Sequence, residues 1–165
     1  MKIRIYNLQD FLEEATHHDL KLKIDKQFHH QGEYERKLIS SKLQGFDGDT
    51  LVFIVTSNSK NHQYENRIQF LEFDSIVNSG KKPIEIARDL MKADVKVSCN
   101  CKDFKYRGYQ YISTSIDAAI EPMNIFPIDR NPELRGVVCK HLNRTISVLP
   151  FNVSKIASLL KSRNN

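Results

Sequence analysis

Three cysteines and one histidine form two closely spaced pairs in the second half of the chain. Cys99 and Cys101 are separated by one residue, and so are Cys139 and His141. Thiolate and imidazole groups are the preferred ligands of zinc, and a structural zinc takes four of them in a tetrahedron. The chain contains 3 cysteines in all. The pattern therefore predicts a structural Zn²⁺ site formed by these four residues.

The elements that must position these pairs follow from their spacing. Residues 94–98 alternate as a strand does, and side chains two residues apart at its end point to the same side. Side chains two residues apart within a helix point to different sides. Cys139 and His141 can therefore share an ion only if Cys139 precedes the helix and His141 lies in its first turn. Apolar residues on one stripe from about Lys140 to Leu149 predict that helix, whose positive end would stabilise a nearby thiolate.

The rest of the pattern predicts an α+β fold: a small antiparallel sheet with flanking helices and a C-terminal zinc-stapled strand–loop–helix module. The run Leu51–Thr56 is typical of a strand buried on both faces, and Tyr64–Phe73 predicts its antiparallel neighbour. Pro83 suits the first turn of a helix, and Asn152 suits the cap of the last one. We expect an N-terminal scaffold over residues 1–93 and a zinc module over residues 94–165.

Other segments carry weaker signals. They predict strands over 2–6, 20–24 and 104–112 (the last bent at Gly108), helices over 7–15, 33–43 and 114–120, and a turn over 45–49. Pro122, Pro127 and Pro132 predict an irregular loop between residues 121 and 135.

Composition and charge restrict the class of protein. With 165 residues, 40% hydrophobic and 27% charged, the chain is typical of a globular domain with at most a small extra module. No apolar run approaches the roughly 18 residues that span a bilayer, and the first residues lack a secretory signal. We therefore expect an intracellular protein, or one delivered without secretion, that has no membrane partner. The odd cysteine count argues against a disulfide framework.

The net charge of +5 is unevenly distributed. Residues 1–97 contain 15 basic and 15 acidic residues, whereas residues 98–165 contain 10 basic and 5 acidic ones. The positive charge therefore belongs to the segment that carries the cysteines.

The Cys-x-Cys…Cys-x-His pattern resembles the SWIM zinc module, a short strand–hairpin–helix unit. The stretches Val95–Phe104, Tyr106–Ile112 and Arg130–Leu142, followed by Leu149–Phe151, resemble proteins of tailed bacteriophages. This resemblance covers about residues 64–160 and implies no known activity. It implies that the zinc ligands are Cys99, Cys101, Cys139 and His141. The 37 residues between Cys101 and Cys139 exceed the usual SWIM hairpin, which indicates an inserted loop.

These features predict a non-enzymatic zinc-binding bacteriophage protein, located in the virion, the host cytoplasm or both. The leading hypothesis is a capsid, neck or tail component whose zinc rigidifies an interface with other virion proteins or with further copies. The alternative is a nucleic-acid-binding factor that uses the basic zinc module, with the candidate contacts Lys105, Arg107, Lys140 and Arg144. One exposed patch, together with DNA binding that falls steeply with salt, would favour the alternative. Residues that are spread out, or that form ion pairs with Asp103 and Glu133, would favour the virion hypothesis.

Several other patterns carry less weight. The aromatic and basic run Phe104–Tyr109 could stack on bases or pack beneath the zinc. The pairs His17–His18 and His29–His30 lack partners at ligand spacing and are expected at the surface. An acidic nuclease-type site of Asp47, Asp49 and Asp74, or a thiol nucleophile with His141 as its base, remains a minor alternative.

Overall fold

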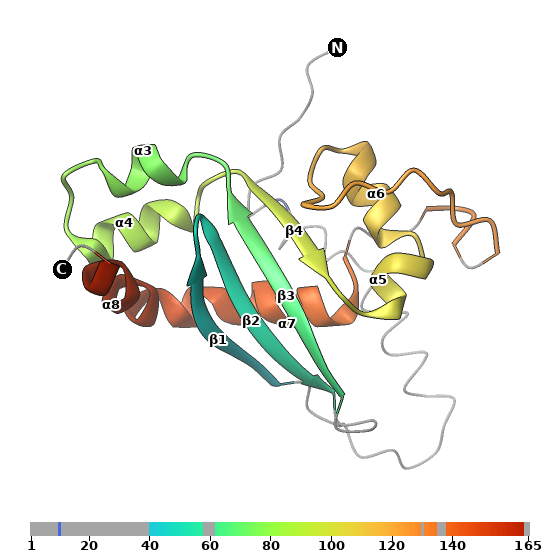
Figure 1. The fold of residues 1–165 in the computed structure, drawn as a ribbon, viewed down its shortest axis with the longest axis horizontal. Coiled ribbons are helices and arrows are strands. Elements are labelled where there is room, and N and C mark those ends of the chain that lie inside the picture. Colours follow the sequence, from blue (N-terminus) through green and yellow to red (C-terminus); the bar gives the residue numbers. More distant parts are fainter. Residues whose placement is uncertain (1–9, 11–39, 58–61, 130, 135–137, 164–165) are drawn as a thin grey trace.

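The computed structural model describes residues 10, 40–57, 62–129, 131–134 and 138–163. Four strands in this part of the chain form one antiparallel sheet in the order β1–β2–β3–β4. Their bounds are Ser40–Asp47, Thr50–Ser57, His62–Phe70 and Val95–Cys99. The predicted α+β class with an antiparallel sheet is confirmed (Figure 1).

Helical segments precede and follow β4. They are α3 (Phe73–Val77), α4 (Pro83–Leu90), α5 (Lys102–Tyr106), α6 (Tyr109–Ser115), α7 (Lys140–Val148), the 3-10 turn η1 (Leu149–Asn152) and α8 (Val153–Arg163). Figure 1 shows α7 and α8 running one after the other along the sheet, with α5 and α6 beyond the end of β4. Among the described helices, none is long and apolar enough to cross a membrane.

The core lies between the sheet and the last two long helices. Side chains of β2 alternate, so that Leu51, Phe53 and Val55 are buried while Val52 and Ile54 are only half-buried. The prediction that this strand is buried on both faces is therefore wrong. Helices α7 and α8 cover the face that carries Phe53, whereas the side chains of the opposite face stay half-buried. The helices contribute Leu142, Ile146, Leu149, Ile156 and Leu160 to the same core.

The predicted division between residues 93 and 94 falls inside this sheet. β4 pairs with β3 from Phe70↔Val95 to Asn66↔Cys99. The core contains residues from both sides of that boundary, and it includes all three cysteines. Three of the four candidate metal ligands thus belong to the principal core.

The elements predicted between Phe104 and Ile120 are wrong. Two short helices, α5 and α6, replace the bent strand, and they are joined at Gly108, which has a φ of 81°. Buried positions recur at Phe104, Gly108 and Ile112. This is a helical spacing, and it outweighs the alternation of the aromatic residues. After Ser115 the chain leaves α6 and makes an isolated parallel bridge from Ala119 to Val97.

The start of the sheet also differs from the prediction. Ser40–Leu43 belong to β1 and not to a helix, and the turn is narrower than predicted because Phe46 and Asp47 still pair with β2. The predicted elements over 2–6 and 20–24 lie outside the described residues, as does most of the predicted helix over 7–15.

Candidate metal centre

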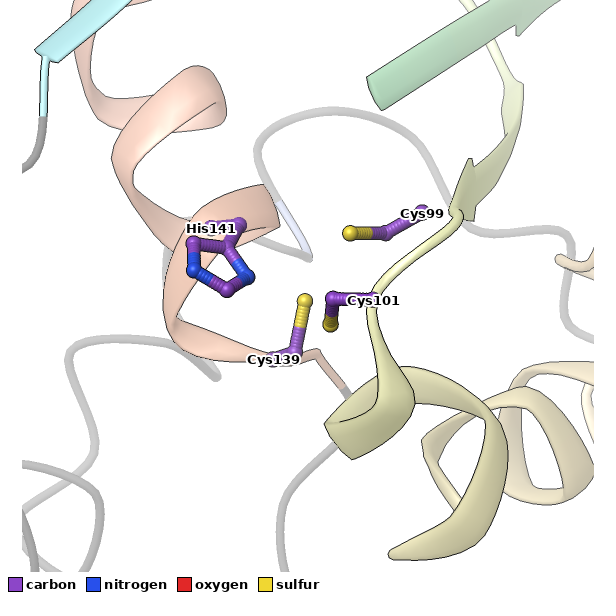
Figure 2. A group of neighbouring side chains, drawn as sticks. All are labelled: Cys99, Cys101, Cys139 and His141. Atoms are coloured by element: carbon purple, nitrogen blue, oxygen red, sulfur yellow. The ribbon is translucent and has the colours of Figure 1, made fainter. Parts of the chain in front are cut away.

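The first cysteine pair is positioned by an extension of the β3–β4 pairing beyond β4. Cys99 ends β4, and the backbone N–H of Asn100 donates to Glu65 O at 3.2 Å. The backbone N–H of Glu65 donates in return to Asn100 Oδ1 at 2.9 Å. Asn100 is thereby held on β3 and stays exposed. Figure 2 shows the two flanking cysteine side chains pointing toward the start of α7.

Cys101 is the N-cap residue of α5. Its Sγ accepts a hydrogen bond from the backbone N–H of Phe104 at 3.2 Å. A sulfur that accepts from an N–H in this way is stabilised as the thiolate, which is the form that binds a metal.

The second pair lies where its spacing requires. Cys139 is the N-cap residue of α7 and accepts the N–H of Asn143 through its carbonyl oxygen at 2.9 Å. His141 lies in the first turn of the helix. Because the helix starts between the two residues, both side chains reach the same point (Figure 2).

Contacts with β3 set the position of α7 along the sheet. The ring of Tyr64 stacks on that of His141, and Asn66 Nδ2 donates to Thr145 Oγ1 at 2.7 Å. Two strand residues advance about 6.6 Å and four helix residues about 6 Å. Successive core-facing residues of β3 therefore meet successive turns of α7. This match brings Cys139 and His141 to the end of β4.

The four predicted ligands lie together and are buried. One donor atom from each of Cys99, Cys101, Cys139 and His141 can be chosen so that all lie within 4.8 Å of one another. A zinc tetrahedron with Zn–S bonds of about 2.3 Å places its sulfurs about 3.8 Å apart. A small contraction would therefore let this group hold a metal ion.

His141 supplies an independent indication of a metal. Its side chain is buried, and neither Nδ1 nor Nε2 has a hydrogen-bond partner within the described part of the chain. Burying a polar group without a partner costs about 1–3 kcal/mol. Coordination of one nitrogen would remove much of this cost, so the residues fit a metal.

Electrostatics within the cluster favour one thiolate among the three cysteines. Hydrogen bonds from the Cys139 and Cys99 thiols lower the pKa of Cys101 well below its ordinary value. The pKa of Cys99 is raised, chiefly by its hydrogen bond to Cys101, and burial raises the pKa of Cys139. Without a metal, these hydrogen bonds and the one from the Phe104 N–H favour the thiolate form at Cys101.

The candidate nucleic-acid contacts are divided between two elements. Lys105 lies in α5 with its Nζ 5.7 Å from the centre of the Tyr106 ring. Arg107 follows α5 and pairs with Asp103 at 3.1 Å, one of the pairings expected of the virion hypothesis. Lys140 and Arg144 are exposed on α7.

The other sequence candidates do not form a second site in the part of the chain that the structure describes. Asp47 pairs with Arg67, and Asp49 accepts from Gln69 at 3.0 Å. Asp74 lies in the first turn of α3. The cysteine–histidine cluster is the single group of possible metal ligands found among the described residues. The two histidine pairs at 17–18 and 29–30 lie outside them.

Tyr64 and Asn100 were missed by the sequence reasoning. Asn100 could have been suspected, because it separates two predicted ligands. Tyr64 gives no such signal, since its proximity to His141 depends on how α7 lies on the sheet. Comparison of the chain with protein-family models, curated proteins and solved structures finds no match.

Proposed function

We propose that the protein binds a structural Zn²⁺ ion and works by binding other macromolecules. The carrying observation is a buried imidazole, that of His141, which lies without hydrogen-bond partners beside three cysteines. Thiolate sulfur with imidazole nitrogen is a donor set that suits zinc. Three thiolates and one Zn²⁺ carry a net charge of −1. The N-terminus of α7 and the N–H of Phe104 favour that charge.

The proposed role of the ion is to join distant parts of the chain. It would connect the end of β4 and the start of α5 to the start of α7, which closes the segment between Cys101 and Cys139 at both ends. Four protein ligands fill a tetrahedron and leave no position for a substrate. This supports a structural ion and a non-enzymatic protein.

Two observations support a protein partner over a nucleic acid. Asp103 partly neutralises Arg107, one of the four candidate phosphate contacts. In addition, exposed apolar side chains gather in the segment that the ion would close, including Ile125 and Ile128. Together with the resemblance to tailed-phage proteins, these features support a virion component in which zinc rigidifies an interface.

Elemental analysis of the purified protein tests the metal. We expect about one zinc per chain, and replacement by Co²⁺ should give the intense thiolate-to-cobalt absorption of a tetrahedral sulfur site. Protein purified without chelators that contains no metal and binds no Co²⁺ would overturn the proposal. Iron in place of zinc would correct the identity of the ion.

Particle purification tests the virion role separately. We expect the protein to remain with intact particles through density-gradient sedimentation and to be detected there by mass spectrometry. Detection only in the lysate of infected cells would contradict a virion component while leaving the zinc site untouched.

A further inference from the structure

The segment between α6 and α7 exposes apolar side chains. Of the seven large hydrophobic side chains exposed among the described residues, four lie between residues 125 and 134. Ile125 and Ile128 are each 74% exposed and Phe126 is 42% exposed. Exposed apolar side chains that cluster in this way mark interaction sites. We call residues 121–129 the apolar loop.

The backbone of the apolar loop is attached to α6. Gln110 Nε2 donates to Glu121 O at 2.8 Å, and the N–H of Met123 donates to Thr114 Oγ1 at 2.9 Å. Pro127 is buried, and Phe126 packs edge-on against Tyr111 with ring centres 5.5 Å apart. The two isoleucines therefore project from a held backbone, which lowers the entropic cost of binding a partner.

The apolar loop also carries negative charge, whereas residues 98–165 as a whole are basic. Exposed Glu121 and Asp129 are its first and last residues. Residues 121–129 contain two acidic residues and no basic one, a net charge of −2, and Arg130 follows them, while residues 98–165 as a whole carry +5. A partner should therefore combine an apolar contact with positive charge.

The same chain presents a surface of that kind at the junction of α7 and α8. Phe151 in η1 is 87% exposed, more than any other large hydrophobic side chain described. Lys155, four residues after Phe151, is the basic residue nearest to this turn in the sequence. Lys155 is exposed and bonds to the carbonyl oxygen of Leu43, so its charge is not neutralised by that partner. We call η1 with Lys155 the basic corner.

We propose that the apolar loop of one copy docks on the basic corner of a second copy, head to tail. In Figure 1 the segment that follows α6 and the helix α8 lie at opposite ends of the molecule, so the contact joins different chains. Such a contact is heterologous, and it repeats into a ring or a filament. This inference deepens the proposed function by naming the partner as the protein itself.

The experiment uses two full-length variants, each with one surface disabled. Ile125→Asp with Ile128→Asp disables the apolar loop, and Phe151→Asp disables the basic corner. All three side chains are well exposed, so we expect zinc content and thermal unfolding to match the wild type. By sedimentation velocity the wild type should form species larger than a dimer, and each variant alone should be monomeric. A mixture of the variants should form a 1:1 dimer and nothing larger, because one intact loop and one intact corner remain.

Leu71→Asp is the matched control. Leu71 is 42% exposed and belongs to neither the apolar loop nor the basic corner, so its replacement should leave assembly unchanged. A zinc-loaded wild type that stays monomeric would overturn the inference and leave the proposed zinc function standing. Dimers of the Phe151→Asp variant alone would indicate a loop-to-loop contact instead. A mixture that stays monomeric would show that the two surfaces do not fit each other. Absence of zinc from every variant and from the wild type would count against the proposed function instead.

Discussion

The ring of Tyr64 stacks on the imidazole of His141, with ring centres 4.3 Å apart and planes inclined by 30°. A histidine that binds a metal usually donates its other N–H to a carboxylate, carbonyl or water, which fixes the ring. His141 has no such partner within the described residues. The stacked phenol is therefore placed to hold the imidazole in one orientation, as a hydrogen bond does at most such sites.

Removing the Tyr64 ring should weaken metal binding. We expect Tyr64→Leu to lower zinc affinity by about tenfold, the lower end of the effect of losing an outer contact of a ligand. Tyr64→Phe should bind as the wild type does, because the ring is retained. Competition with a chromophoric chelator measures both affinities. Tyr111→Leu, which removes a ring packed on Phe126, is the control, and equal affinities for all three variants would contradict the orienting role.

Loss of one ligand should release the segment before α7. In Cys139→Ser the start of α7 loses its connection to Cys99 and Cys101, and the segment over 108–134 is then held by its remaining contacts, among them the bridge from Ala119 to Val97 of β4. We expect new protease cleavage sites within 108–134, identified by mass spectrometry of a limited digest.

The control for this digest is Lys140→Ala, which changes an exposed residue between two ligands and should leave the cleavage pattern unchanged. A Cys139→Ser digest identical to that of the wild type would show that the cluster does not organise this segment.

The grouping of Cys99, Cys101, Cys139 and His141 could be predicted because its chemistry is local in the sequence. Two pairs with one-residue spacing, one after a strand and one at a helix entry, leave few arrangements for a tetrahedral ion. The helix at Lys140 and the strand ending at Cys99 follow from periodicity, and both are present. The two pairs do not indicate the position of α7 along the sheet. That position depends on Tyr64 and Asn66 of β3, which contact successive turns of the helix.

The region after Cys101 was misread for a physical reason. Phe104, Tyr106, Tyr109 and Tyr111 suggested a strand, yet Tyr106 is exposed while Phe104 and Ile112 are buried. The four-residue interval between buried positions only becomes evident once Gly108 is recognised as one of them. A glycine has no side chain whose hydrophobicity could signal burial.

Metal binding should release protons. The raised pKa values of Cys99 and Cys139 keep both thiols protonated at neutral pH, whereas the lowered pKa of Cys101 leaves that group ionised. Binding as three thiolates then displaces about two protons per ion, so affinity should rise steeply with pH, about a hundredfold per unit near neutrality. Calorimetry in buffers of different ionisation enthalpy counts the protons.

The variant Cys99→Ser tests the origin of these protons. A serine hydroxyl stays protonated, so a metal ion held by the remaining ligands should displace about one proton. Zinc binding to the wild type with no net proton release would mean that all three thiols are already ionised before the metal arrives, contrary to the raised pKa values.

Gly108→Ala should separate the stability of the apolar loop from that of the metal site. Gly108 has a φ of 81°, and a Cβ there would lie 2.2 Å from Pro127 Cγ. The left-handed backbone and the overlap together should cost about 2–4 kcal/mol of unfolding free energy, measured by denaturant titration of the zinc-loaded protein. Gly45→Ala is the matched control, since a Cβ at Gly45 meets nothing within 4 Å. Zinc stoichiometry should be unchanged in both variants because neither touches a ligand. If Gly108→Ala and Gly45→Ala were equally stable, Pro127 would not rest on Gly108, and the apolar loop would lack the fixed backbone on which its docking depends.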